Sequence, residues 1–237
     1  MKTTPETASF APTAVAAGPG FEVHAGKRRL SAEPGVPLQL PSRALAEAVR
    51  DEWQRAGPNA RMSDLRLASL AVATADAGNL RRHIEQTLLK YADTDLVCYW
   101  STEGEPLDLR ARQAAAWQPM LDWVADTYGA RLRVNRGIVP ASQDAAALAK
   151  LRVALEGLSA ADLMAVRLAS AAAGSVVIGL GLIRSAWTVD TAYAAAAVDE
   201  AYQMDRWGTD SEAAAALEAR RADLADAVRF ATLWRGA

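Results

Sequence analysis

Residues 188–208 read TVDTAYAAAAVDEAYQMDRWG, and the rest of the chain is interpreted around this stretch. Its length predicts one helix of about five and a half turns. Thr188 is a favourable N-cap, and Asp190 follows in the first turn, where a carboxylate complements the positive end of the helix dipole. Gly208 has the conformational freedom that a C-cap requires. We therefore expect one uninterrupted helix between Thr188 and Gly208.

One face of this helix is apolar except for a single acid. At about 100° per residue, the face collects Val189, Tyr193, Ala196, Ala197, Met204 and Trp207. Glu200 lies in the middle of the face, and Asp199 and Gln203 flank it. An acid in an apolar face must be paired, neutralised or used to bind another molecule. Two interpretations stay open: an internal ion pair with an arginine, or a surface acid that contacts a partner.

The composition is that of a folded protein without a strongly charged surface. The chain has 237 residues, of which 51% are apolar, and this is ample for a hydrophobic core. A formal net charge of −2 and the lack of basic runs argue against nucleic acid as a partner. The longest apolar run, residues 171–183, predicts a buried core helix and no membrane insertion. No secretory signal is visible, so we expect a cytoplasmic protein. A eukaryotic protein of this kind would act in the mitochondrial matrix, but no transit peptide is visible.

Secondary-structure signals change at residue 41. Residues 1–9 are polar and are expected to be disordered. Residues 10–40 alternate apolar and polar side chains between Gly and Pro breaks, which predicts a small antiparallel β meander. We expect an α+β protein that is mostly α, with a β domain over residues 1–41 and an α-helical domain over residues 42–237.

The region after residue 42 shows helical periodicity almost throughout. Ser42, Ser63, Ser142 and Ser159 are candidate N-caps, and Gly78 is expected to separate two helices. Pro119 either kinks a helix or opens the next one. The predicted helical segments cover residues 43–56, 63–77, 80–90, 107–117, 119–128, 143–157, 160–173, 188–208 and 211–234.

A search for catalytic or metal-binding patterns gives no enzyme signature. Cys98 has no histidine near it in sequence and is interpreted as a small buried residue. Asp93 and Asp95 lack a third metal ligand and are better interpreted as caps of the local backbone. We therefore expect no cofactor, no metal and no catalytic residue. Among the seven tryptophans, Trp117 and Trp207 are candidate anchors of a protein-binding surface.

Four separated segments together resemble a known family. They are VPLQLPSRALAEAV at residues 36–49, YADTDLVCY at 91–99, RQAAAWQP at 112–119 and VDEAYQMDRWG at 198–208. Their order and spacing are similar to those of the assembly chaperones that handle the alpha subunit of the F-type ATP synthase catalytic head. The hairpin around His24 and the sequence Met62-Ser63-Asp64 depart from the family pattern.

The resemblance implies a β domain, a larger helical domain and a non-enzymatic chaperone. Such a protein would bind the free alpha subunit, prevent its aggregation and release it into the alpha/beta hexamer; the free chaperone is expected to be a monomer. The family's functional acid maps to Glu200 or Asp199, and the helical pattern favours Glu200. The candidate partner-binding residues are Glu200, Asp199, Gln203, Trp207 and Trp117. Two alternatives stay open: an enzyme with an acidic site around Asp199 and Glu200, and a helical scaffold for another protein.

Overall fold

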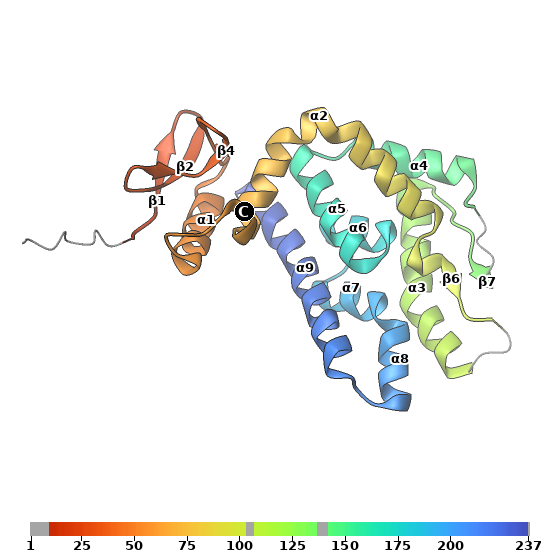
Figure 1. Cartoon of the computed structure of the whole chain (residues 1–237). Helices are drawn as coiled ribbons and strands as arrows, with labels where there is room; N and C mark the ends of the chain where they lie inside the picture. The colour runs from red at the N-terminus through yellow and green to blue at the C-terminus, as the bar shows by residue number, and fades with distance from the viewer. Residues whose placement is uncertain (1–9, 103–106, 137–141, 237) are drawn as a thin grey trace, which may run out of the picture. The chain divides into compact units, whose positions relative to one another are not determined.

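The computed structural model describes residues 10–102, 107–136 and 142–236 and is an α+β structure that is mostly helical (Figure 1). This confirms the predicted fold class. The chain forms two compact units, Met1–Asp76 with Thr232–Ala237, and Ala77–Ala231. The predicted boundary at residue 41 marks the change from strand to helix, and the first unit extends beyond it. The prediction of disorder for residues 1–9 lies outside the described residues.

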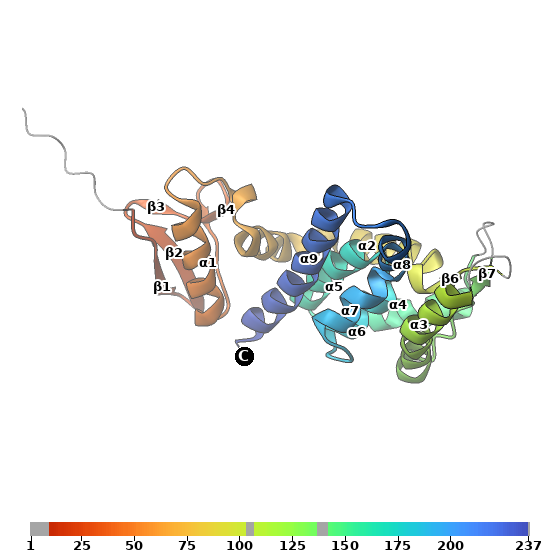
Figure 2. The same ribbon diagram turned by 90° about the horizontal axis from the view of Figure 1, so that it is seen from below.

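The first unit contains the predicted meander. β1 (Thr13–Ala17), β2 (Gly20–Ala25) and β3 (Arg28–Arg29) form an antiparallel sheet in that order, and β4 (Ser31–Glu33) pairs with β5 (Val36–Pro37). α1 (Arg43–Ala56) packs on β1 and β2, and Figure 2 shows it along one face of the sheet. A meander of this size needs such a partner, because an isolated small sheet is marginally stable in water.

The sequence predicted α1 residue by residue. The Ser42 side chain accepts a hydrogen bond from the Leu45 amide, and Gly57 ends the helix at a positive φ of 86°. The apolar face that was expected from helical spacing is buried; it consists of Leu45, Val49 and Trp53. Local caps and the 3.6-residue period agree here, so the helix could be placed without tertiary information.

Where the structure describes it, the second unit is helical except for one short parallel strand pair, β6 (Tyr99–Trp100) with β7 (Asn135–Arg136). α6 (Val176–Ile183) is buried along its whole length and packs against α3, α5 and α7, which confirms the expected core helix (Figure 1). The other helices among the described residues are α2 (Arg66–Asp93), α3 (Leu107–Tyr128), α4 (Ala145–Glu156), α5 (Ala160–Ala173), α7 (Val189–Ala196), α8 (Val198–Trp207) and α9 (Ser211–Arg235), with 3-10 turns η1 (Met62–Asp64) and η2 (Leu96–Cys98). None of the described helices is long and apolar enough to cross a membrane.

Several predicted helix boundaries were wrong. Residues 66–93 form one helix that runs through Gly78, because buried positions recur at helical spacing on both sides and an interior glycine costs only about 1 kcal/mol. α3 likewise contains Pro119 in its interior. The N-cap of α4 is Asp144 rather than Ser142, since the Asp144 carboxylate accepts the Ala146 amide. Ser159 caps α5 as expected.

Asp95 caps the local backbone, as the sequence suggested, whereas Asp93 binds an amide of a distant segment. Asp93 accepts the Gln143 amide at 2.7 Å. Asp95 is fully buried and accepts the amides of Val97, Val176 and Val177 at 3.2, 2.7 and 3.1 Å. It thereby joins η2 to the N-terminus of α6. Burial raises the pKa of this carboxyl to about 6, against the opposing effect of its hydrogen bonds.

Candidate functional site

The stretch 188–208 is two helices, which corrects the prediction of one. Thr188 caps α7, Asp190 lies in its first turn and Gly208 ends α8, all as expected. Between them, Ala197 has φ −115° and ψ 16° and interrupts the helix. The interruption changes which residues face the core, so the predicted apolar face is not continuous.

Two side chains from distant parts of the chain bind carbonyl groups at this break. The Trp117 indole Nε1 of α3 donates to the Ala195 carbonyl at 2.8 Å. The Arg220 Nη1 of α9 donates to the Ala196 carbonyl at 2.9 Å. Carbonyl groups at a helix end need such donors, because a buried unpaired acceptor costs about 1–3 kcal/mol. The break is therefore a supported structural feature.

Glu200 forms the internal ion pair that was one of the two interpretations, and its side chain is also partly exposed. Its Oε1 accepts the same Arg220 Nη1 at 2.9 Å, so the expected ion pair with an arginine is present. The two side chains are nevertheless 40% and 29% exposed, for Glu200 and Arg220 respectively. The acid is thus held in one position by an arginine and still reaches the surface.

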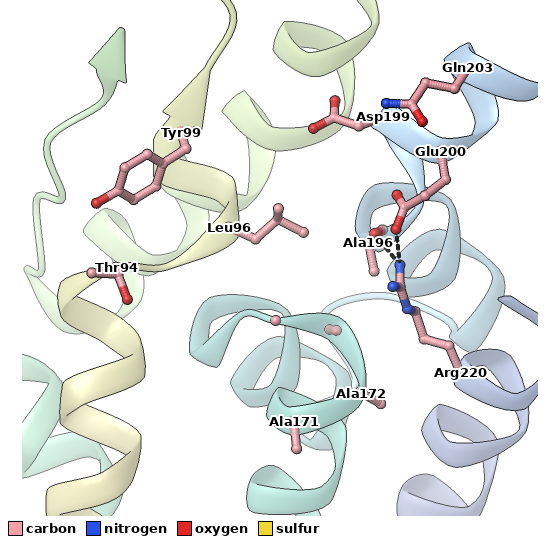
Figure 3. Close-up of a pocket in the computed structure, with 12 residues that line it drawn as sticks. Thr94, Leu96, Tyr99, Ala171, Ala172, Ala196, Asp199, Glu200, Gln203 and Arg220 are labelled. Atoms are coloured by element: carbon pink, nitrogen blue, oxygen red, sulfur yellow. Dashed lines mark hydrogen bonds and ion pairs between the residues drawn. The ribbon is translucent and has the colours of Figure 1, made fainter. Parts of the chain in front are cut away.

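Figure 3 shows that Glu200 and Arg220 face each other at one side of a pocket of about 570 Å³. The opposite side comes from the end of α2 and from η2, where Thr94 and Leu96 lie. The C-terminal turn of α5 forms the floor between them. The lining residues are Thr94, Leu96, Tyr99, Ala171, Ala172, Ala173, Gly174, Ala196, Asp199, Glu200, Gln203 and Arg220.

Asp199 is fixed from α3. The Gln113 side chain is buried; its Nε2 donates to Asp199 Oδ1 at 2.8 Å, and its Oε1 accepts the Ser101 amide at 2.8 Å. A second pocket, of about 500 Å³, lies on this side of α8. Its lining residues are Ser101, Leu109, Asp199, Tyr202, Gln203, Arg206 and Trp207.

α8 is also fastened to α3 by a cluster that the sequence analysis missed. Arg112 and Arg206 each place a guanidinium 5.5 Å from the centre of the Tyr202 ring. Arg112 pairs with Asp205 at 2.6 Å, and this hydrogen bond raises the pKa of Arg112 further. Arg206 donates to the Tyr202 hydroxyl at 2.6 Å. Only the spacing of Tyr202 and Arg206 is visible in the sequence; the contribution of α3 depends on tertiary packing.

Four of the five candidate partner-binding residues lie together on α8. Asp199, Gln203 and Trp207 follow at intervals of four residues with Glu200 beside them, and we call this set the α8 face. The Trp207 side chain is 76% exposed, which is unusual for a large apolar residue. Trp117 is 1% exposed and belongs to the core, so its assignment as a surface anchor was wrong.

The described residues offer little for catalysis. They contain no group of three or more His, Cys, Asp or Glu side chains that could hold a metal ion. Burial raises the pKa of the Cys98 thiol, which makes this cysteine a poor nucleophile. Asp199 and Glu200 are both engaged, with Gln113 and Arg220. The site therefore consists of an exposed helix face between two open pockets.

Comparison with known proteins identifies the family. The sequence pattern of the ATP12 chaperone protein matches residues 6–125. The chain belongs to the ATP12 chaperone family. The match confirms the family that the four sequence segments suggested.

Solved structures of the ATP12 type agree with this assignment. Atp12 from Paracoccus denitrificans is 32% identical with a TM-score of 0.84, covering 95% of this chain and 96% of its own. A variant of that protein in which an aspartate is replaced by lysine is 31% identical, with the same coverage and TM-score. A protein from Agrobacterium tumefaciens, described as a candidate chaperone, is 28% identical with a TM-score of 0.84, covering 94% of this chain and 83% of its own.

Proposed function

We propose that this ATP12-family protein is a non-enzymatic assembly chaperone for the alpha subunit of the F-type ATP synthase catalytic head. It binds the free alpha subunit, which we call the client, prevents its aggregation and releases it into the alpha/beta hexamer. The observation that carries the proposal is the α8 face, where an exposed tryptophan and two fixed acids lie on the same helix in a member of a chaperone family.

The chemistry of the α8 face suits a temporary partner. A free subunit exposes apolar surface that its oligomer would bury, and such surface aggregates. Trp207 supplies an exposed aromatic anchor, the residue type that most often dominates interface energies. Asp199 and Glu200 supply charges that set orientation and reject wrong partners. A small face of this kind covers a client without holding it permanently.

The proposal includes a free chaperone that is monomeric and acts in the cytoplasm. Its relatives from Paracoccus and Agrobacterium are bacterial proteins, and no described helix could cross a membrane. Size-exclusion chromatography with light scattering checks the oligomeric state. A stable dimer that buries Trp207 would contradict the monomeric form.

The test of function is a light-scattering assay on isolated alpha subunit. We expect near-equimolar chaperone to suppress aggregation without ATP. Trp207→Ala and Glu200→Lys should lose most of this protection, whereas Tyr91→Ala and Asp126→Lys should keep it. The two controls change an exposed aromatic residue of α2 and an exposed acid of α3 outside the α8 face. Protection that requires ATP hydrolysis, or that survives both α8 substitutions, would refute the proposal.

A further inference from the structure

A third pocket, of about 280 Å³, lies between β6, the first turns of α3 and β7. It differs from the two pockets beside α8 because arginines are the only ionisable side chains among the described residues that line it. The lining residues are Trp100, Ser101, Arg110, Ala111, Ala114 and Arg136.

The local structure builds this pocket in a defined way. The parallel pairing of β6 and β7 sets Trp100 opposite Arg136, and the Arg136 guanidinium lies 5.7 Å from the centre of the indole ring. Stacking on an aromatic ring orients the planar guanidinium fork. On α3, Arg110 and Ala114 are four residues apart and share a face. Alanine side chains on that face leave the space in which the guanidinium groups are accessible.

The two arginines stand out because no carboxylate of the described residues pairs with them. Among the residues that the structure describes, neither Arg110 nor Arg136 has an ion-pair partner, whereas the nearby Arg112 and Arg206 pair with Asp205 and Asp108. Two like charges in one pocket repel each other, and an oxyanion between them would relieve the repulsion. The guanidinium fork matches the two oxygens of a carboxylate or phosphate group.

We propose that this pocket binds the carboxylate of an aspartate or glutamate side chain of the client. The inference rests on the proposed function and adds the chemistry of a second contact. Ser101 lines both this pocket and the one beside Asp199 and Trp207, so the two hollows adjoin. The surface that the client contacts then carries the acids of the α8 face and, beside them, Arg110 and Arg136. A client with the complementary pair of charges would bind in only one register.

The experiment compares two double variants that remove the same charge. Arg110→Gln with Arg136→Gln empties the pocket of cations, and Arg152→Gln with Arg167→Gln removes two exposed arginines from α4 and α5. Each protein is titrated with isolated alpha subunit at low and at high salt. We expect at least about 10-fold weaker binding for the pocket variant, with a reduced dependence on salt, because charge-assisted hydrogen bonds are lost. The control variant should bind within about twofold of the wild type.

The outcomes separate the two proposals. Pocket and control variants that bind the alpha subunit equally well would overturn this inference and leave the proposed function standing. A wild-type protein that does not bind the alpha subunit would overturn both. Arg136→Gln alone, at an exposed position, provides a second variant if the double substitution impairs folding, and at least about threefold weakening is expected. In a parallel titration with inorganic phosphate, saturable binding at the pocket combined with unchanged client affinity of the pocket variant would reassign the site to a free anion and refute the client contact.

Discussion

Removing Glu200 or Arg220 should have different effects on stability, although the two side chains form one ion pair. Arg220 donates both to Glu200 and to the Ala196 carbonyl at the helix break. Glu200→Ala removes only the ion pair. Because both side chains are about a third exposed, water screens the pair, and we expect a loss of about 0.5–1 kcal/mol in the free energy of unfolding. A fully buried pair would instead cost about 3–5 kcal/mol.

Arg220→Ala should cost more, because the Ala196 carbonyl also loses its donor. An unpaired and mostly buried carbonyl adds about 1 kcal/mol, which gives a total of about 1.5–2 kcal/mol. The double variant should resemble Arg220→Ala, since the ion pair is already absent in that single variant. The coupling energy from the cycle should be about 0.5–1 kcal/mol.

Urea denaturation of the four proteins measures these differences. In a thermal melt, each kcal/mol corresponds to about 2–4 °C for a chain of this size. Equal losses for the two single variants would show that the bond to Ala196 contributes nothing to the break. A loss above about 3 kcal/mol for Glu200→Ala would show that the acid is structural and is not available to a client. Either result would refute the reasoning above.

Three further predictions concern the interior of the helical unit. Burial raises the Asp95 pKa from 3.8 to about 6, so the free energy of unfolding should fall by about 3 kcal/mol as the pH rises from about 4 to about 6. Urea titrations across that pH range should show this fall for the wild type and not for Asp95→Asn. Gly181→Ala should destabilise the fold by at least about 2 kcal/mol, because the added Cβ would lie 2.0 Å from the Trp187 ring. Gly78→Ala, where the added Cβ meets open space, should instead stabilise the fold by about 0.5–1 kcal/mol. Equal melting temperatures for these two variants would contradict the prediction. Trp117→Phe should cost about 1–2 kcal/mol in chemical denaturation by removing the indole donor to Ala195, and an unchanged midpoint would argue against that bond.

Features that depend on neighbouring residues could be predicted from the sequence. The caps at Ser42, Ser159 and Thr188, the buried α6 and the change from strands to helices all follow from short-range patterns. Predictions failed where tertiary contacts overrule local signals. The periodicity of buried residues carries α2 through Gly78, although glycine taken alone suggests a helix end.

The candidate site could be predicted only in part, because some of its features depend on neighbouring residues and others on tertiary contacts. Helical spacing placed Glu200 and Trp207 on one face with Asp199 and Gln203 flanking it, and in the structure these residues lie together on α8. The break at Ala197 has no local signal, because alanine is a strong helix former and the donors that support the break come from other helices. Trp117 was misassigned because its sequence context shows only an aromatic residue beside polar ones. The carbonyl that its indole binds belongs to another helix and cannot be seen in that context.

The break between α7 and α8 has a consequence for how mutational screens of this family are interpreted. The backbone alone does not determine where α8 points, because Ala197 interrupts the helix and side chains of α3 and α9 bind the two carbonyls that precede it. A substitution at Trp117 or Arg220 can therefore redirect the α8 face while every residue on it is unchanged. In a screen for weakened client binding, such variants would score like contact residues. A buried residue such as Trp117 that scores as a contact would then indicate a changed orientation of α8. Only a position whose substitution weakens binding while α8 keeps its orientation would belong to the surface that the client contacts.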